Sequence, residues 1–88
     1  MKYKELNPID FGLNKRVKIV KISKDNIGIV KARKSRIIMK DGIQISELAS
    51  IIILKDPGLS VSLIISGPIC SKTISYLDKK SINVITLD

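Results

Sequence analysis

Basic side chains gather in one part of this sequence and are the residues best suited to chemistry. Ten of the 16 lysines and arginines lie within residues 15–40, where only Asp25 opposes them, and the chain carries a formal charge of +8. Ammonium and guanidinium groups in such a run bind phosphates without reading bases. The side chains predicted to do so are Lys18, Lys21, Lys31, Arg33, Lys34 and Arg36. The competing interpretation is that they are solvated charges, which keep the edges of a small sheet from pairing with other chains.

The type of nucleic-acid contact is limited by the shortage of aromatic residues. On paired strands, Lys18 with Lys31, or Lys21 with Arg33, would share a face and form a positive ribbon. The chain has only three aromatic residues and no tryptophan, whereas sheets of the RRM or OB type stack bases on aromatic side chains. The ribbon is therefore expected to contact phosphates and not bases, on DNA or on RNA.

Catalytic and metal-binding chemistry is poorly supported. The chain has no histidine and a single cysteine, which excludes Ser-His and Cys-His catalysis and the commonest metal sites. Asp25, Asp41 and Asp56 occupy positions where aspartate serves a turn, and no pair of carboxylates is spaced for acid–base work. The glycines are isolated and form no phosphate-binding loop. We expect no catalytic residue, no metal ligand, no cofactor and no enzymatic activity of this chain alone.

The single cysteine, Cys70, cannot form an internal disulfide and does not indicate an oxidising compartment. Its spacing from Ile74 and Leu77 places it on the apolar face of a helix, so we expect a small buried thiol and not a nucleophile. No apolar run approaches the ~18 residues of a membrane span, and the first residues lack the apolar region of a signal peptide. A cytoplasmic protein without a membrane partner is expected.

The composition predicts which elements hold these residues. With 18 Ile and 5 Val against 8 Leu, β-branched side chains favour strands over helices. We expect an α+β, β-dominated fold of about six to seven short strands in hairpins, forming a small sheet or sandwich. One short helix near 70–80 and a final strand at 82–87 complete it. Residues 1–16 are expected to form an N-terminal arm or irregular edge, and residues 17–88 a single β-rich domain.

Turn residues divide the β-rich domain into strands. The expected strands span 17–22, 27–33, 36–39, 43–45, 50–54 and 59–66. Lys40, Asp41 and Gly42 are expected to form a hairpin turn, because Asp-Gly between apolar runs is a strong hairpin signal. Residues 50–54 are expected to form the most buried strand, and no segment other than 70–80 is expected to be helical.

Two segments, 36–54 and 69–88, resemble the N-terminal β domain of the CRISPR adaptation integrase, the metal-dependent endonuclease of spacer acquisition. The similarity is carried by the Lys40-Asp41-Gly42 turn, the connection 45–53, the helix 71–77 and the closing strand 82–88. Residues 55–63 look like an insertion, and residues 1–16 lie outside the pattern. The chain stops at Asp88, about where the family's linker to its helical catalytic domain would begin. The resemblance implies a CRISPR-associated role in antiviral defence without the family's metal site, which belongs to the catalytic domain.

The resemblance implies the leading hypothesis, a non-catalytic β module that homodimerises, sheet against sheet, and contacts nucleic acid. Its dimer interface is expected at the apolar residues Ile52, Leu54, Leu59, Val61 and Leu63, which are more than a small interior can bury. One alternative is a stand-alone basic DNA- or RNA-binding protein that uses the positive ribbon. Another is an adaptor subunit that docks by its sheet edge onto a larger protein.

Overall fold

The computed structural model describes residues 3–87 and has an α+β fold with one sheet. Along the chain the elements are β1 (Lys4–Leu6), the 3-10 helix η1 (Pro8–Phe11), β2 (Ile19–Ser23), β3 (Asn26–Lys31), α1 (Met39–Lys55), β4 (Ser60–Ile65), α2 (Ser71–Lys79) and β5 (Asn83–Thr86). The predicted fold class is confirmed. The described residues contain five strands and not six to seven, and two α-helices in place of one.

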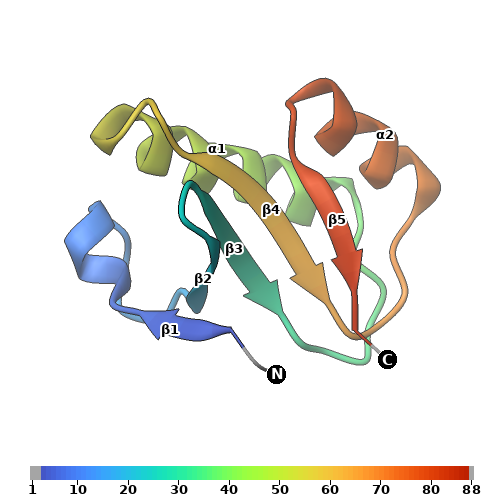
Figure 1. Ribbon diagram of the computed structural model, residues 1–88. Coiled ribbons are helices and arrows are strands. Elements are labelled where there is room, and N and C mark those ends of the chain that lie inside the picture. The colour runs from blue at the N-terminus through green and yellow to red at the C-terminus, as the bar shows by residue number, and fades with distance from the viewer. Residues whose placement is uncertain (1–2, 88) are drawn as a thin grey trace.

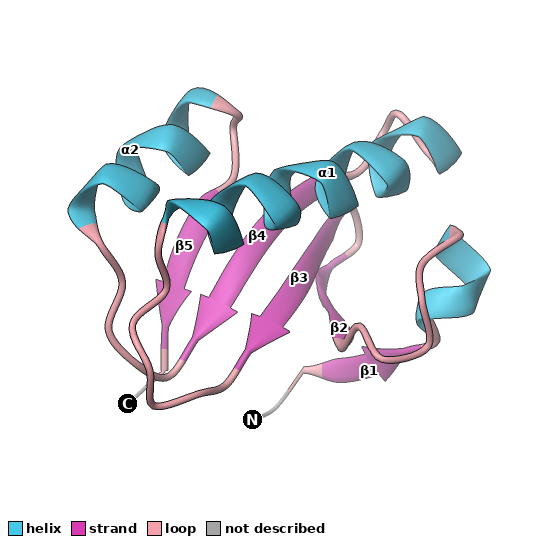
Figure 2. Cartoon of the chain, turned by 180° about the vertical axis from the view of Figure 1, so that it is seen from behind, coloured by secondary structure: helices cyan, strands magenta, loops and turns pink. Residues whose placement is uncertain are grey.

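The sheet is mixed, with the strand order β1-β2-β3-β4-β5. The first three strands form antiparallel pairs, which confirms the predicted hairpin of β2 and β3, whereas β4 pairs in parallel with both β3 and β5. α1 and α2 make the parallel crossovers and cover the same face of the sheet (Figures 1 and 2). Because β3, β4 and β5 end at one edge, the connections 32–38 and 66–70 meet there. We call this the carboxyl edge, and ligands of open α/β sheets bind at such an edge.

The prediction of a hairpin and a buried strand within residues 36–54 is wrong, because most of this segment is the helix α1. Its buried stripe has a helical period and includes Ile45, Ala49 and Ile52. By contrast, Leu54 of the expected buried strand is 84% exposed. β-branched residues favour strands only in a suitable context, and burial of one apolar stripe against a sheet overrides that preference.

The predicted helix near 70–80 and the final strand are confirmed as α2 and β5. The buried side of α2 differs from the expected one. Ile74 is 40% exposed, and the buried residues are Thr73 and Leu77. Thr73 faces α1 at Gly42, where an added Cβ would lie 2.8 Å from the threonine methyl. Gly42 therefore allows the two helices to approach closely and is not a hairpin residue.

Most residues of the predicted dimer interface lie inside the single chain. Ile52, Val61 and Leu63 belong to the core between the sheet and the helices and are no more than 2% exposed. Leu59 is half-buried against that core, and Leu54 is exposed near the end of α1. The interface as predicted is therefore wrong for the three core residues, since a partner cannot contact buried side chains.

A second apolar cluster lies on the other face of the sheet, which neither helix covers. It consists of the buried Val20, Val30 and Ile64 with the half-buried Tyr3, Ile22, Ile85 and Leu87. Ile22 and Ile64 fold over Gly28, where an added Cβ would lie within 3 Å of both side chains. We call this surface the open face.

The first sixteen residues, expected as an arm or irregular edge, contain the edge strand β1 and the helix η1. β1 pairs with β2, with Lys4 opposite Lys21. The Asn7 side chain accepts a hydrogen bond from the Ile9 backbone and caps η1. Within residues 3–87, no helix is long and apolar enough to cross a membrane.

Candidate nucleic-acid interface

Five basic residues follow one another from the end of β3 to the first turn of α1, at the carboxyl edge of the sheet. They are Lys31, Arg33, Lys34, Arg36 and Lys40, and we call them the basic cluster. Residues 34, 36 and 40 are exposed, whereas residues 31 and 33 are half-buried. Four of the six residues predicted to bind nucleic acid belong to this cluster. Lys40, which the sequence placed in a turn, joins them because it lies in the first turn of α1 beside Asp41, which pairs with Arg33.

Arg33 and Asp41 form the central ion pair of the cluster. The Nη2 of Arg33 donates to Oδ2 of Asp41, and its contact with the backbone oxygen of Arg36 spans 3.4 Å. The same carboxylate oxygen accepts a hydrogen bond of 3.0 Å from the Ile38 backbone N–H, which caps the start of α1. Asp41 thereby links the connection after β3 to the first turn of the helix.

The charge of Asp41 is favoured by this arrangement. Its pKa is lowered chiefly because the Ile38 N–H donates to the carboxylate, although partial burial opposes the shift. The hydrogen bond and charge of Arg33 lower the pKa further, and the charge of Lys31 adds to them. Asp41, the carboxylate next to the basic cluster, is thus ionised and paired with Arg33. It therefore leaves the positive charges of the other four basic residues largely unneutralised.

The second connection of the carboxyl edge packs directly on the cluster. The Ile37 N–H donates to the Pro68 oxygen over 3.0 Å, and the Cys70 N–H donates to the Ile37 oxygen over 2.9 Å. A Cβ added at Gly67 would lie 2.2 Å from the Arg33 oxygen. The backbone that carries the basic cluster is therefore held in place by the connection between β4 and α2.

Lys18 and Lys21, also predicted to bind nucleic acid, lie apart from the cluster. Ile19 pairs with Ile29 and faces the helices. Lys18, just before Ile19, accepts a backbone hydrogen bond from the Val30 N–H, so its side chain leaves the opposite face. Lys21 pairs with Ile27, four residues before Lys31 on β3, which corresponds to about 13 Å along a strand. The prediction of a continuous positive ribbon is therefore wrong, because strand alternation and register separate Lys18 and Lys21 from Lys31.

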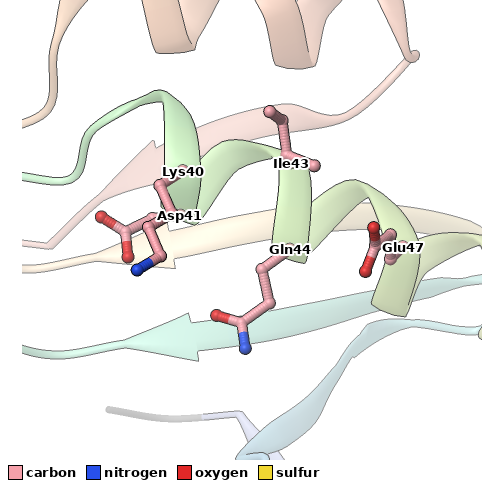
Figure 3. A pocket seen from close by; sticks show the side chains of 5 residues that line it. All are labelled: Lys40, Asp41, Ile43, Gln44 and Glu47. Carbon is pink, nitrogen blue, oxygen red and sulfur yellow. The ribbon is translucent and has the colours of Figure 1, made fainter.

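A shallow hollow of ≈ 260 Å³ adjoins the cluster along α1. Its lining residues are Lys40, Asp41, Ile43, Gln44 and Glu47, and Figure 3 shows Gln44 and Ile43 projecting from opposite sides of the helix. The hollow is smaller than the ~300–1,000 Å³ of ordinary small-molecule pockets. It extends the polar surface beside the cluster and does not enclose a substrate.

Residues 3–87 contain no group of three or more histidine, cysteine, aspartate or glutamate side chains that could hold a metal ion. Cys70 is not the buried thiol of an apolar helix face that we expected. It is the N-cap residue of α2 and is half-buried, with a free thiol. The prediction for Cys70 is wrong because the buried face of α2 differs from the expected one and contains Thr73 instead of Cys70.

Comparisons with known proteins identify the fold and no family. No family model and no curated protein matches the chain. Among solved structures, that of EndoMS in apo form is similar, with a TM-score of 0.66 and 15% sequence identity. The match covers 82% of this chain and 31% of the EndoMS chain. None of these findings links the chain to the CRISPR adaptation integrase, so that resemblance stays a prediction, and what the comparisons establish is a likeness of fold.

Proposed function

We propose that this chain is a non-catalytic module that binds the phosphate backbone of nucleic acid through the basic cluster. The observation that carries the proposal is the succession of five basic residues at the carboxyl edge, where the neighbouring carboxylate of Asp41 is engaged by Arg33. Lysine and arginine neutralise phosphates by charge, and such contacts position a protein on nucleic acid without reading its sequence. The nucleic acid is expected to lie across the 32–38 connection and the start of α1.

The arrangement favours a polyanion over a small anionic metabolite. The side chains of Lys34, Arg36 and Lys40 lie along the surface and do not converge into an enclosed pocket. A strand of nucleic acid offers phosphates at regular intervals and can engage several such side chains at once. Affinity should therefore come from many weak contacts and fall as salt rises.

The test is fluorescence anisotropy with labelled DNA and RNA of mixed sequence over a series of salt concentrations. In the variant Lys31→Gln/Lys34→Gln/Arg36→Gln, affinity is expected to fall. The slope of log affinity against log salt should become shallower by about 2–3, at ~0.7–0.9 for each phosphate that the variant no longer neutralises. Affinity should change little with base sequence, because the protein binds phosphates and not bases.

A matched control removes the same charge from the opposite edge of the sheet. Lys24→Gln/Lys55→Gln/Lys79→Gln alters the β2–β3 turn and the last turns of α1 and α2, and should leave the salt slope nearly unchanged. Equal reductions of affinity in the two triple variants would mean that net charge alone drives binding, and would refute a defined site. Wild-type affinity that ignores salt would refute phosphate binding itself.

Homodimerisation is a second proposal, and a different observation supports it. The open face exposes parts of four large apolar side chains that neither helix covers. Partly exposed apolar side chains gathered on one uncovered face form a surface that a second copy of the chain can cover. We propose that two copies pair through their open faces, in place of the core residues expected from the sequence. Sedimentation over a range of protein concentrations tests this pairing.

A further inference from the structure

The two edge strands of the sheet differ in how their outer sides are protected. β1 forms one edge and β5 the other, and β1 is a short strand that exposes the charged Lys4 and Glu5. β5 has the sequence Asn-Val-Ile-Thr, with no charged residue and no proline, and it pairs with β4 in a regular register without a bulge. Charges, prolines and bulges are the usual means by which proteins keep an edge strand from pairing further. β5 is an edge that has none of them.

The backbone of β5 offers hydrogen-bonding groups on its outer side. The Leu87 N–H donates to the Ile65 oxygen on β4 over 2.8 Å. Because alternate residues of a strand turn their backbone groups to the same neighbour, Ile85 also faces β4, whereas Val84 and Thr86 face outwards. No strand within residues 3–87 pairs with this outer side. The N–H and C=O groups of Val84 and Thr86 are thus available to a further extended backbone, which offers donors and acceptors at the matching spacing.

Apolar side chains flank this edge on both faces of the sheet. On the helix side, Val84 is half-buried against the core, and α2 lies beside the outer side of β5 in both views (Figures 1 and 2). Tyr76 of α2 lies at Gly42 of α1, whereas Ile74, two positions earlier, is on the opposite side of the helix and is 40% exposed. On the open face, Ile85 is half-buried. An added strand therefore gains apolar contacts on either face.

The charges near β5 favour an acidic peptide over the other possible occupants. In α2 and the turn that leads to β5, Lys72, Lys79 and Lys80 are exposed and only Asp78 opposes them. The whole chain carries a formal charge of +8, so a second copy brings the same excess of positive charge to the edge. The backbone of a nucleic acid carries phosphates but no N–H donors for the outward C=O groups of β5. An extended peptide with carboxylates matches both the backbone groups and the charge.

We propose that β5 accepts an acidic extended segment of a partner protein as an additional strand of the sheet. The segment hydrogen-bonds to the outward groups of Val84 and Thr86, covers Val84 and Ile74 on the helix side, and covers Ile85 on the open face. In such strand additions, backbone hydrogen bonds supply the affinity and the alternate side chains supply the selectivity. This interaction does not depend on phosphate binding by the basic cluster.

The probe is the fluorescein-labelled peptide EEVTVTVTEE, an acidic segment rich in strand-forming residues, and binding is followed by fluorescence anisotropy. The wild-type protein should bind this peptide, and should bind a version with lysines in place of the glutamates more weakly. A version N-methylated along its central residues keeps every side chain and charge but has no N–H donors there, and should not bind. Equal affinity for the N-methylated peptide, or no binding of the acidic one, would overturn the proposal. Equal affinity for the lysine version would contradict the preference for an acidic partner.

Two variants at one exposed position locate the contact. Thr86→Pro removes an outward N–H and leaves the hydrogen bonds to β4 in place, so affinity should fall by about tenfold. Thr86→Val keeps the N–H and the branched side chain and should bind the peptide as wild type does. Circular dichroism and melting curves confirm that both variants are folded. Equal affinities of the two variants would place the peptide elsewhere and refute strand addition at β5.

Two measurements separate β5 from the other edge and a partner from a second copy. Hydrogen exchange of the wild-type protein, followed by NMR, should show that the peptide protects the N–H groups of Val84 and Thr86 and leaves those of β1 unchanged. Protection of β1 alone would overturn the assignment. Sedimentation without peptide should give the same oligomeric state for wild type and Thr86→Pro. If the proline alone turned dimers into monomers, a second copy would be the occupant of β5, contrary to the proposal.

Discussion

At the scale of single residues, Asp41 has two roles, as a helix cap and as the partner of Arg33. It caps α1 through the Ile38 N–H and pairs with Arg33 in the connection after β3. Both contacts are strongest with the ionised carboxylate, whose side chain is 19% exposed. A charge that supports both a helix start and a strand end is a natural place to test how pH acts on this fold.

The substitution Asp41→Asn should lower the free energy of unfolding by about 1 kcal/mol at pH 7, the usual contribution of a capping side chain. The pKa of Asp41 is lowered from 3.8 in the folded chain. The contribution of the Asp41 carboxylate to the free energy of unfolding is therefore fully present above its unfolded-state pKa. It is lost as pH falls through the lower folded-state pKa. Urea unfolding of both proteins from neutral to strongly acidic pH should show their difference shrinking at the acidic end.

Glu47→Gln is the control for this change. It removes the same charge from α1 at a side chain that makes neither contact. Its difference from wild type should stay small across the pH range. A difference between wild type and Asp41→Asn that stays constant down to the acidic end would contradict the assigned role of the carboxylate.

Much of the basic cluster can be predicted from residue types alone, because lysine and arginine attract phosphates in any fold. The Arg33–Asp41 pair cannot. Asp-Gly is a strong hairpin signal, so the sequence predicts a turn at Asp41 and not a helix cap. The same error separates Lys40 from the cluster, and the side from which Lys18 projects depends on a strand register that composition does not reveal.

At the scale of elements, α1 shows how propensity and packing compete. Its isoleucines predict strands one by one, yet Ile45, Ala49 and Ile52 align at helical spacing and bury one stripe against the sheet. β2, β3, β4 and β5 are predictable, because alternation and turn residues agree there. The parallel pairing of β3 with β4 is not predictable, because it requires a crossover helix. That helix lies in an isoleucine-rich segment whose composition predicts strands.

The junction of the two connections at the carboxyl edge depends on Gly67. An added Cβ would lie 2.2 Å from the backbone oxygen of Arg33, which cannot turn aside as a side chain can. Gly67→Ala should therefore destabilise the protein by about 1–3 kcal/mol, the range of overpacking substitutions. Denaturant midpoints with unchanged slopes would measure this destabilisation. Because Arg33 must shift, phosphate binding should weaken as well.

Gly58→Ala is the matched control in the turn before β4. Its added Cβ would lie 3.4 Å from the Asp56 side chain, which is an ordinary contact at an exposed position. It should change the midpoint little. Equal stability of the two alanine variants would show that the connections 32–38 and 66–70 move apart easily, and would contradict a rigid basic cluster.

At the scale of the whole molecule, the two faces of the sheet differ in what covers them. α1 and α2 seal one face, whereas the open face relies on its own side chains folding over Gly28. The resemblance to the integrase domain predicts a sheet-against-sheet dimer. That resemblance draws partly on a hairpin at 40–42, where the structure has the first turn of a helix. The support for a dimer comes instead from the open face.

Pairing through the open face predicts a dimer that one substitution separates. Ile85→Lys places a charge among the half-buried apolar side chains of β5 and should give monomers, because an unpaired charge is costly to bury in an interface. Ile43→Lys introduces the same charge on α1, where the isoleucine is 45% exposed on the covered side, and should leave the dimer intact. Analytical ultracentrifugation of the three proteins separates these outcomes. At a protein concentration of about 100 µM, even a weak association with a free energy of roughly −5 to −6 kcal/mol is detected. A wild-type chain that stays monomeric at this concentration would rule out the dimer and leave the open face exposed to solvent.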